Sequence, residues 1–262
     1  PGGFVEPEDT PVDELATLLR DRLQTEPELL KRWNQVNMLL RAAFGFPFED
    51  GYQEVAASNA QERKWRIVHA TAAVKCHLSL FLLACALHPE QARELDEFDL
   101  RGPQALPEHS TSTHQTALHL AASSNAGGEP GKTVIYTLLS LHREAAQLQD
   151  GIDGSLPLHR MVENPRKQDW PNHAQILHHF YPRAVQIPDR SGKLPLHRAA
   201  AGIAHEDHEG DQERSVIIQL VRVFPQAAAH WDDDRCLPLH YLALNATVWD
   251  DDVEAVYNAH RN

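Results

Sequence analysis

The sequence predicts an all-α solenoid of about five stacked repeat units, preceded by a helical cap at the N-terminus. The tetrapeptide Leu-Pro-Leu-His begins at residues 156, 194 and 237, and looser copies occupy residues 66–70 and 116–119. The histidines of the five copies lie 50, 40, 38 and 43 residues apart. Recurrence at such a period is typical of supersecondary units that bury their apolar faces against neighbouring units. These motif histidines are His69, His119, His159, His197 and His240.

We expect a helical cap before the repeats. Thr10, Pro11 and the acids that follow them are typical of a helix start. Residues 29–44 then place apolar side chains at helical spacing, which predicts an amphipathic helix with a buried face. That face either shields the core of the first repeat or docks a partner protein, and the capping role is the preferred interpretation because terminal repeats need such cover. The predicted division is an extended or disordered segment over residues 1–9, the cap over 10–58 and the repeats over 59–262.

Each repeat unit reads as a turn followed by two helices. In the fourth copy, Asp189 and Gly192 suit a tight turn that contains a left-handed residue, and Pro195 supplies the φ angle that favours the first turn of a helix. A second, apolar-rich helix begins at Ser215 and stops at Pro225. The loops that follow the first helices are long, and they span residues 164–172, 202–214 and 245–251.

The turn, the tetrapeptide and the alanine-rich first helix resemble the ankyrin repeat, whose pattern is an Asp-x-x-Gly turn followed by Thr-Pro-Leu-His. Leu in place of Thr, with aromatic-Pro-x-Ala breaks at residues 181–184 and 224–227, is similar to a variant abundant in diatoms and related algae. Arg235 at the turn glycine departs from the pattern. The resemblance covers roughly residues 59–262. It implies helix-loop-helix units with β-hairpin turns, in which the motif histidines form hydrogen bonds between adjacent repeats.

The resemblance also implies a function in protein–protein interaction, as a scaffold, an adaptor or a structural subunit of a larger assembly, and not as an enzyme. Ankyrin proteins contact their partners through the concave face, which is formed by the hairpin tips and the exposed side of the first helices. Those positions lie seven, six and four residues before each motif histidine and four and five residues after it. The implied partner-binding residues are Ser112, Thr113, Gln115, Ser123, Ser124, Ile152, Asp153, Ser155, Glu163, Asn164, Arg190, Ser191, Lys193, Ala201, Asp233, Asp234, Leu244 and Asn245.

The net charge of −13 at pH 7 predicts a basic or neutral protein partner. It argues against nucleic acid, whose phosphates require a basic footprint. No stretch approaches the roughly 20 apolar residues of a membrane span, and no secretory signal is present. Cys76, Cys85 and Cys236 lack metal-like spacing and predict an intracellular protein, cytoplasmic or nuclear. An organelle stays open because the sequence begins at Pro1, so a targeting segment could have been removed.

Two further motifs bear on chemistry. Residues 126–133 fit a relaxed phosphate-loop pattern, so the alternative function is a nucleotide-binding or nucleotide-hydrolysing module that uses Lys132 and Thr133. A phosphate loop follows a buried strand, whereas residues 116–123 predict a helix, so a plain connecting loop is preferred. Residues 205–209 contain ligand-type side chains, but nothing orients them toward a metal, and we interpret the segment as a solvated acidic loop. We therefore predict no catalytic residue, cofactor or metal site.

Overall fold

The computed structural model describes residues 18, 21–22, 25–43, 65–74, 76–96, 114–124, 128–163, 173–202, 215–245 and 249–261. Over these ranges the chain contains 11 α-helices and no strand, which confirms the predicted all-α class for this part of the protein. None of the helices in the described ranges combines the length and the apolar character that crossing a bilayer requires. The predicted N-terminal segment 1–9 and the acidic segment 205–209 lie outside the described residues, as do most of the long loops.

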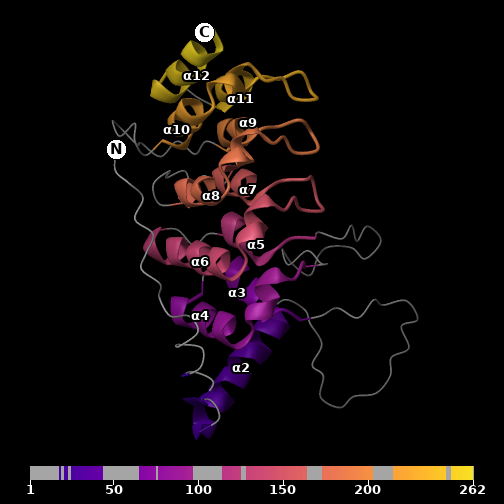
Figure 1. Cartoon of the computed structure of the whole chain (residues 1–262), viewed down its shortest axis with the longest axis vertical. Helices are drawn as coiled ribbons and strands as arrows, with labels where there is room; N and C mark the ends of the chain where they lie inside the picture. The colour runs from indigo at the N-terminus through magenta and orange to yellow at the C-terminus, as the bar shows by residue number, and fades with distance from the viewer. Residues whose placement is uncertain are drawn as a thin grey trace, which may run out of the picture.

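The helices form two rows (Figure 1). The first helices of the units, α3, α5, α7, α9 and α11, pack each against the next in one continuous row. In the second row, α4 packs against α6, α6 against α8, and α10 against α12. The first helices are α3 (Ile67–Ala73), α5 (Ala117–Ser123), α7 (Pro157–Glu163), α9 (Pro195–Ala201) and α11 (Pro238–Asn245), and the second are α4 (Leu78–Leu87), α6 (Gly128–Leu141), α8 (Gln175–Phe180), α10 (Val216–Val223) and α12 (Asp251–Arg261).

The first helices are too short to be stable alone, because four of them have only seven residues and helix nucleation is costly. Packing between the units stabilises them. Small side chains such as Ala70, Ala121 and Ala200 are fully or almost fully buried where neighbouring first helices meet. Larger buried side chains, among them Phe81 and Ile135, come from the second helices and fill the space between the rows. One continuous core therefore runs the length of the stack.

The second helices α4, α6, α8 and α10 are each followed by a short 3₁₀ segment that turns the chain toward the next unit. The segments η6 (Pro182–Gln186) and η7 (Pro225–Ala229) begin at the prolines of the aromatic-Pro-x-Ala breaks, and η1 (Pro89–Arg93) also begins at a proline. η3 (Arg143–Gln147) has the same form without a proline. In each segment the alanine third or fourth from the start is buried. Proline ends the preceding helix, and alanine lets the chain pass close to the core.

The N-terminal helix α2 (Pro27–Ala43) lies at the α3 end of the stack (Figure 1). Its Trp33 is buried, and the indole Nε1–H of Trp65 donates to Asn37 Oδ1 at 2.7 Å. The expectation that its apolar face is buried is only partly right, because Leu29 and Leu30 are exposed. Only the side of α2 that includes Trp33 packs against the first unit, and the side with Leu29 and Leu30 is left uncovered.

Candidate functional site

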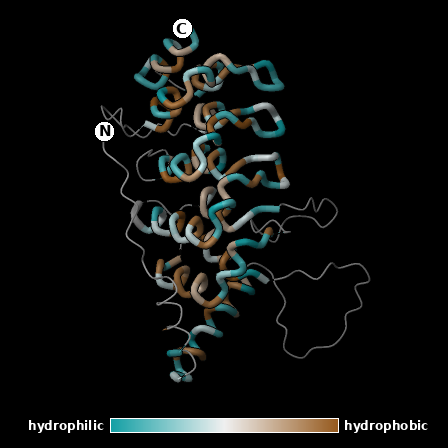
Figure 2. Tube along the Cα trace, viewed as in Figure 1, coloured by the Kyte–Doolittle hydropathy of each residue, from teal (hydrophilic) through white to brown (hydrophobic). Residues whose placement is uncertain are grey.

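Three turns project from the same edge of the stack, each directly before a first helix (Figure 1). The tips of the turns before α9 and α11 are predominantly hydrophilic, whereas the tip of the turn before α7 includes an apolar stretch (Figure 2). They occupy residues 149–155, 188–193 and 231–236. A backbone hydrogen bond closes each turn in the manner of a hairpin, for example from Asp189 N–H to the Lys193 carbonyl at 2.9 Å. The closing pairs do not extend into strands within the described residues.

One position in each turn adopts the left-handed backbone conformation. The residue five before the motif histidine has a φ of 73° at Gly154 and at Gly192, 58° at Arg235 and 41° at His114. Glycine tolerates this region without strain, whereas a side chain there is disfavoured. At Gly192 a Cβ atom would also lie 2.8 Å from Asp233 Oδ1. Arg235 therefore keeps the turn conformation at a cost that the two glycines avoid.

A buried aspartate organises each turn from inside. Asp189 Oδ1 accepts the backbone N–H groups of Ser191 and Lys193 at 2.8 and 3.0 Å. Its other carboxylate oxygen binds the guanidinium of Arg198, which follows the motif histidine on α9. Asp232 repeats the pattern, with the Tyr241 hydroxyl donating to Oδ2 at 2.6 Å. Burial and this hydrogen bond raise the pKa of Tyr241. Each carboxylate thus ties a turn to its own helix.

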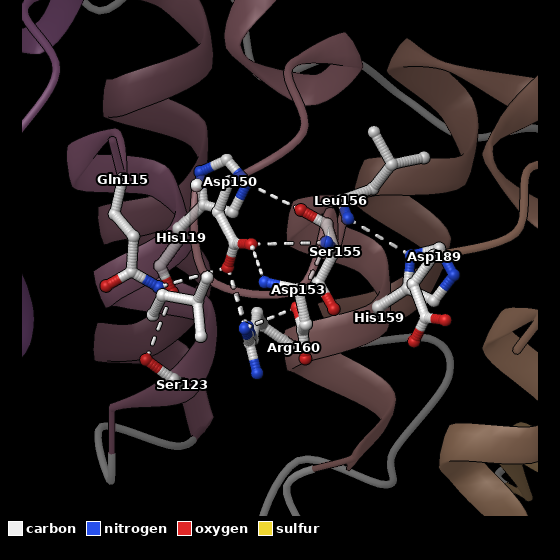
Figure 3. Close-up of polar contacts among 12 residues, drawn as sticks. Gln115, His119, Ser123, Asp150, Asp153, Ser155, Leu156, His159, Arg160 and Asp189 are labelled. Carbon is white, nitrogen blue, oxygen red and sulfur yellow. Dashed lines mark hydrogen bonds and ion pairs between the residues drawn. The ribbon is translucent and has the colours of Figure 1, made fainter. Parts of the chain in front are cut away.

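Arginine side chains link the turns of successive units. Arg160 lies against the carboxylates of Asp150 and Asp153 (Figure 3), with N–O distances of 2.7 Å to both. Arg198 reaches back to the preceding unit, to Asp153 at 2.7 Å and Glu163 at 3.1 Å. Burial alone would raise the pKa of Asp153, but its hydrogen bond with Ser155 and the two arginines lower it to about 2. Two acids implied to bind partners are therefore neutralised by the chain's own arginines.

Four of the five motif histidines, His69, His119, His159 and His197, join adjacent units by hydrogen bonds. In α7, Nδ1 of His159 accepts the backbone N–H of Leu156 at 3.1 Å, and Nε2 lies 3.1 Å from the carbonyl oxygen of Lys193 in the next unit. Because Nδ1 accepts and a carbonyl can only accept, Nε2 carries the proton and the ring is neutral. The corresponding Nε2 contacts run from His69 to Glu94, from His119 to Ser155 and from His197 to His230, each at 3.1 Å.

The structure corrects three of the implied partner-binding residues. Gln115, Ser124 and Ser155 are buried, so a partner cannot reach their side chains. Gln115 donates to the Asp150 carboxylate at 3.3 Å, and Ser124 Oγ donates to the Ala121 carbonyl at 2.9 Å. Ser155 lies on the inner arm of its turn, where its carbonyl accepts from the preceding unit. The spacing from the motif histidine therefore does not predict the accessibility of Ser155, because this arm of the turn faces the neighbouring unit.

The other implied residues differ in their accessibility. Ser123, Arg190, Ala201, Asp233, Asp234 and Leu244 are exposed. Ile152, Asp153, Glu163, Ser191, Lys193 and Asn245 are half-buried. Ser112, Thr113 and Asn164 lie outside the described residues.

Sequence reasoning missed Trp231, which precedes the last turn and is 56% exposed. Its ring centroid lies 6.0 Å from that of His240. The sequence did carry a signal for Trp231, because an aromatic residue stands directly before the turn aspartate. The two preceding turns have Gln149 and Pro188 at that position.

The phosphate-loop pattern has helical geometry in its described part. Gly128 to Thr133 belong to the first turns of α6, and the element before them is the helix α5. A phosphate loop instead needs free amides that converge after a strand. In the described part of the chain, no group of three or more histidine, cysteine or acidic side chains is placed to hold a metal ion.

Comparison with protein-family models and with curated proteins finds no match.

Proposed function

We propose that this chain is an ankyrin-repeat protein that acts as a protein–protein interaction scaffold or adaptor and not as an enzyme. Its partner would bind across the turn tips and the adjoining exposed side of the first helices. The observation that carries the proposal is the contrast within each turn. The inner side is held by an aspartate, a histidine and backbone hydrogen bonds, as in the turn before α9. The tip is exposed at Arg190 in that turn and at Asp233 and Asp234 in the last turn, and it is half-buried in the turn before α7. A rigid, exposed surface lowers the entropy cost of binding.

The charges on this surface favour a neutral partner segment at its middle and a basic one toward the C-terminus. In the middle, Asp153 and Glu163 are paired with arginines of the chain. Arg190 adds a positive charge at the neighbouring tip. In the last turn Asp233 and Asp234 are exposed. Electrostatic complementarity of this kind sets the orientation and the rate of association more than the affinity.

The compartment that fits the proposal is the cytoplasm or the nucleus. Cys76, Cys85 and Cys236 are free. Burial raises the pKa of the Cys85 thiol, which keeps it protonated and unreactive. Free thiols are usual in a reducing compartment.

The test begins with affinity purification and mass spectrometry to identify the partner, followed by calorimetric titration of the purified pair. A triple variant with Ser123→Arg, Ala201→Arg and Arg190→Glu changes three exposed positions of the proposed surface. We expect its Kd to rise at least tenfold, because bulk and reversed charge disrupt a complementary surface. The matched control carries Arg183→Glu, Gln186→Arg and Gln226→Arg, at exposed positions of η6 and η7 that follow the second helices, and it leaves the net charge unchanged as the triple variant does. Equal affinity of the triple variant and the wild type would refute the proposal.

A further inference from the structure

Arginines on the two sides of the stack differ in their partners. Beside the first helices and the turns, Arg66, Arg160 and Arg198 each have a carboxylate oxygen of the chain 2.7 Å away. Arg93 and Arg143 lie in the 3₁₀ segments that follow the second helices α4 and α6, and both are exposed. Among the described residues neither has a carboxylate within ion-pair distance. A chain with a net charge of −13 therefore leaves two cations unpaired on the side of the second helices.

Two contacts bring these arginines to the same helix end. The Nε–H of Arg93 donates to the Leu141 carbonyl at 3.4 Å, and Nδ1 of His142 lies 3.3 Å from the Ala92 carbonyl oxygen. Leu141 is the last residue of α6, and Arg143 is the first residue of η3. Both arginines therefore lie at the C-terminal end of α6, on the side of the stack away from the turns (Figure 1).

Helix capping explains only part of this arrangement. A basic side chain near the C-terminal end of a helix interacts favourably with the last carbonyl groups. Arg93 uses its Nε–H for such a contact, and within the described residues its two Nη groups make no hydrogen bond. Arg143 packs on an aromatic ring and makes no hydrogen bond to a described residue. Most of the donors of the two guanidinium groups therefore remain available to a ligand.

The aromatic ring belongs to the next unit and holds Arg143 in place. Its Cζ lies 5.0 Å from the centroid of the Phe180 ring on α8. Tyr136 and the exposed His179 pack edge-to-face against the same ring, with centroids 6.3 and 5.6 Å away. A guanidinium held on a ring keeps N–H groups free for a carboxylate. Arginine beside aromatic side chains is the composition typical of an interface hot spot.

The nearest acids do not neutralise the two arginines. Glu90 and Glu144 are exposed, and their carboxylates lie 3.5 Å from Nδ1 of His88 and 3.8 Å from Nε2 of His142. These acids limit the local charge, so a short ligand with a few carboxylates suits the region. Nucleic acid or an anionic membrane suits it less, because their extended negative charge is repelled by a chain of net charge −13. A short segment avoids most of this repulsion, since salt screens charges beyond about 8 Å at physiological ionic strength.

We propose that the arginine patch, defined as Arg93, Arg143, His179 and Phe180, binds an acidic segment of a partner protein. One carboxylate of the segment binds the guanidinium of Arg93 and a second binds that of Arg143, while an adjoining apolar side chain contacts Phe180. A second copy of this chain is a poorer occupant, because two chains of net charge −13 repel one another. The patch goes beyond the proposed function, because it lies on the second helices and takes a ligand of the opposite charge from the last turn.

The probe is a short fluorescein-labelled peptide in which glutamates flank one phenylalanine, and fluorescence anisotropy measures its Kd for the full chain. We expect saturable binding that weakens at least about fivefold in the double variant Arg93→Gln with Arg143→Gln. The matched control is Lys31→Gln with Arg32→Gln, at exposed positions of α2, which removes the same charge and should leave the Kd unchanged. Equal weakening by the two pairs, or no saturable binding at millimolar peptide, would overturn the proposal.

A charge-swapped pair of substitutions separates binding from folding. The variant Arg93→Glu with Arg143→Glu should lose the acidic peptide. It should bind a peptide with lysines in place of the glutamates at least about fivefold more tightly than Lys31→Glu with Arg32→Glu, which has the same net charge. Equal Kd values for the lysine peptide would contradict a binding site at the patch.

Two further measurements test the choice of occupant. Flotation with vesicles of equal parts phosphatidylcholine and phosphatidylserine should show no binding that depends on Arg93 and Arg143. Such binding, without binding of the acidic peptide, would overturn the choice in favour of a membrane. Sedimentation that shows a concentration-dependent dimer, lost in the double variant, would overturn it in favour of a second copy. The turn-edge triple variant leaves all four residues of the patch unchanged, so the two proposals fail independently.

Discussion

The four buried motif histidines predict that the stack unfolds steeply in mild acid. Burial, as the largest cause, lowers the pKa of His69, His119, His159 and His197 to about 4 in the folded chain. The hydrogen bonds of the histidine rings also oppose their protonation. In three of the rings Nδ1 accepts a backbone N–H, and a proton added there would face another donor. In the unfolded chain the same side chains titrate near pH 6.5.

The unfolded chain therefore takes up these protons first. The contribution of each neutral histidine to stability is complete above about pH 6.5 and is lost as the pH falls from 6.5 toward 4. The two pKa values give a loss of about 2 kcal/mol for each histidine at pH 5 and about 3 kcal/mol at pH 4. Four histidines together remove about 8 kcal/mol at pH 5, which is comparable with the whole stability of a typical domain, about 5–15 kcal/mol.

Urea unfolding followed by circular dichroism, at half-unit steps from pH 7.5 to 5, measures this loss directly. We expect a slope near pH 5 of about 5 kcal/mol per pH unit, which corresponds to four extra protons bound by the unfolded chain. Asp153 contributes little to this loss, because its stabilising effect disappears only as the pH falls from its ordinary pKa of 3.8 toward its folded pKa of about 2. His197→Gln should reduce the slope by about a quarter, whereas His240→Gln, at an exposed histidine, should leave it unchanged. A free energy of unfolding that is constant from pH 7 to pH 5 would refute the reasoning.

Three further predictions concern stability, each measured by urea unfolding at pH 7.5. Arg235→Gly should raise the free energy of unfolding by about 0.5–1 kcal/mol, because glycine adopts the φ of 58° without strain; a loss of stability would contradict this account of the turn. Leu196→Ala should cost about 2–5 kcal/mol and Leu239→Ala clearly less, because Leu196 is buried and Leu239 half-buried; equal costs would count against the packing described. Arg198→Ala should cost about 3–5 kcal/mol, because it leaves the buried carboxylate of Asp189 without its cation, and a cost below about 1 kcal/mol would show that the pair is not needed.

The ion pairs also change the meaning of substitutions at the implied partner surface. Charge reversal at Asp153 or Glu163 places a positive charge beside Arg160 and Arg198. Such a variant loses stability whether or not a partner binds there. Partner binding is therefore tested at Ser123, which is exposed and has no ionisable side chain.

The sequence alone determined the order of the elements and the spacing of the units. The reason is that these features depend on interactions between residues close together in the chain. Gly192 signals the left-handed turn residue through its own conformational freedom, and Pro195 signals the helix start through its fixed φ. His197 closes a hydrogen bond with Leu194, three residues earlier. Patterns of this kind recur with each unit and are visible without the fold.

Tertiary structure decided which side of each turn is accessible and which charges are neutralised. Ser155 and Asp233 both belong to turns, yet one is buried under the preceding unit and the other is exposed, because the two arms of a turn face different neighbours. The link from Arg198 to Asp153 spans 45 residues of sequence, and no local pattern pairs them. The exposure of His240 is equally invisible in the sequence, because its motif is identical to those of His159 and His197. Only the packing of a neighbouring unit in the structure separates the buried histidines from the exposed one.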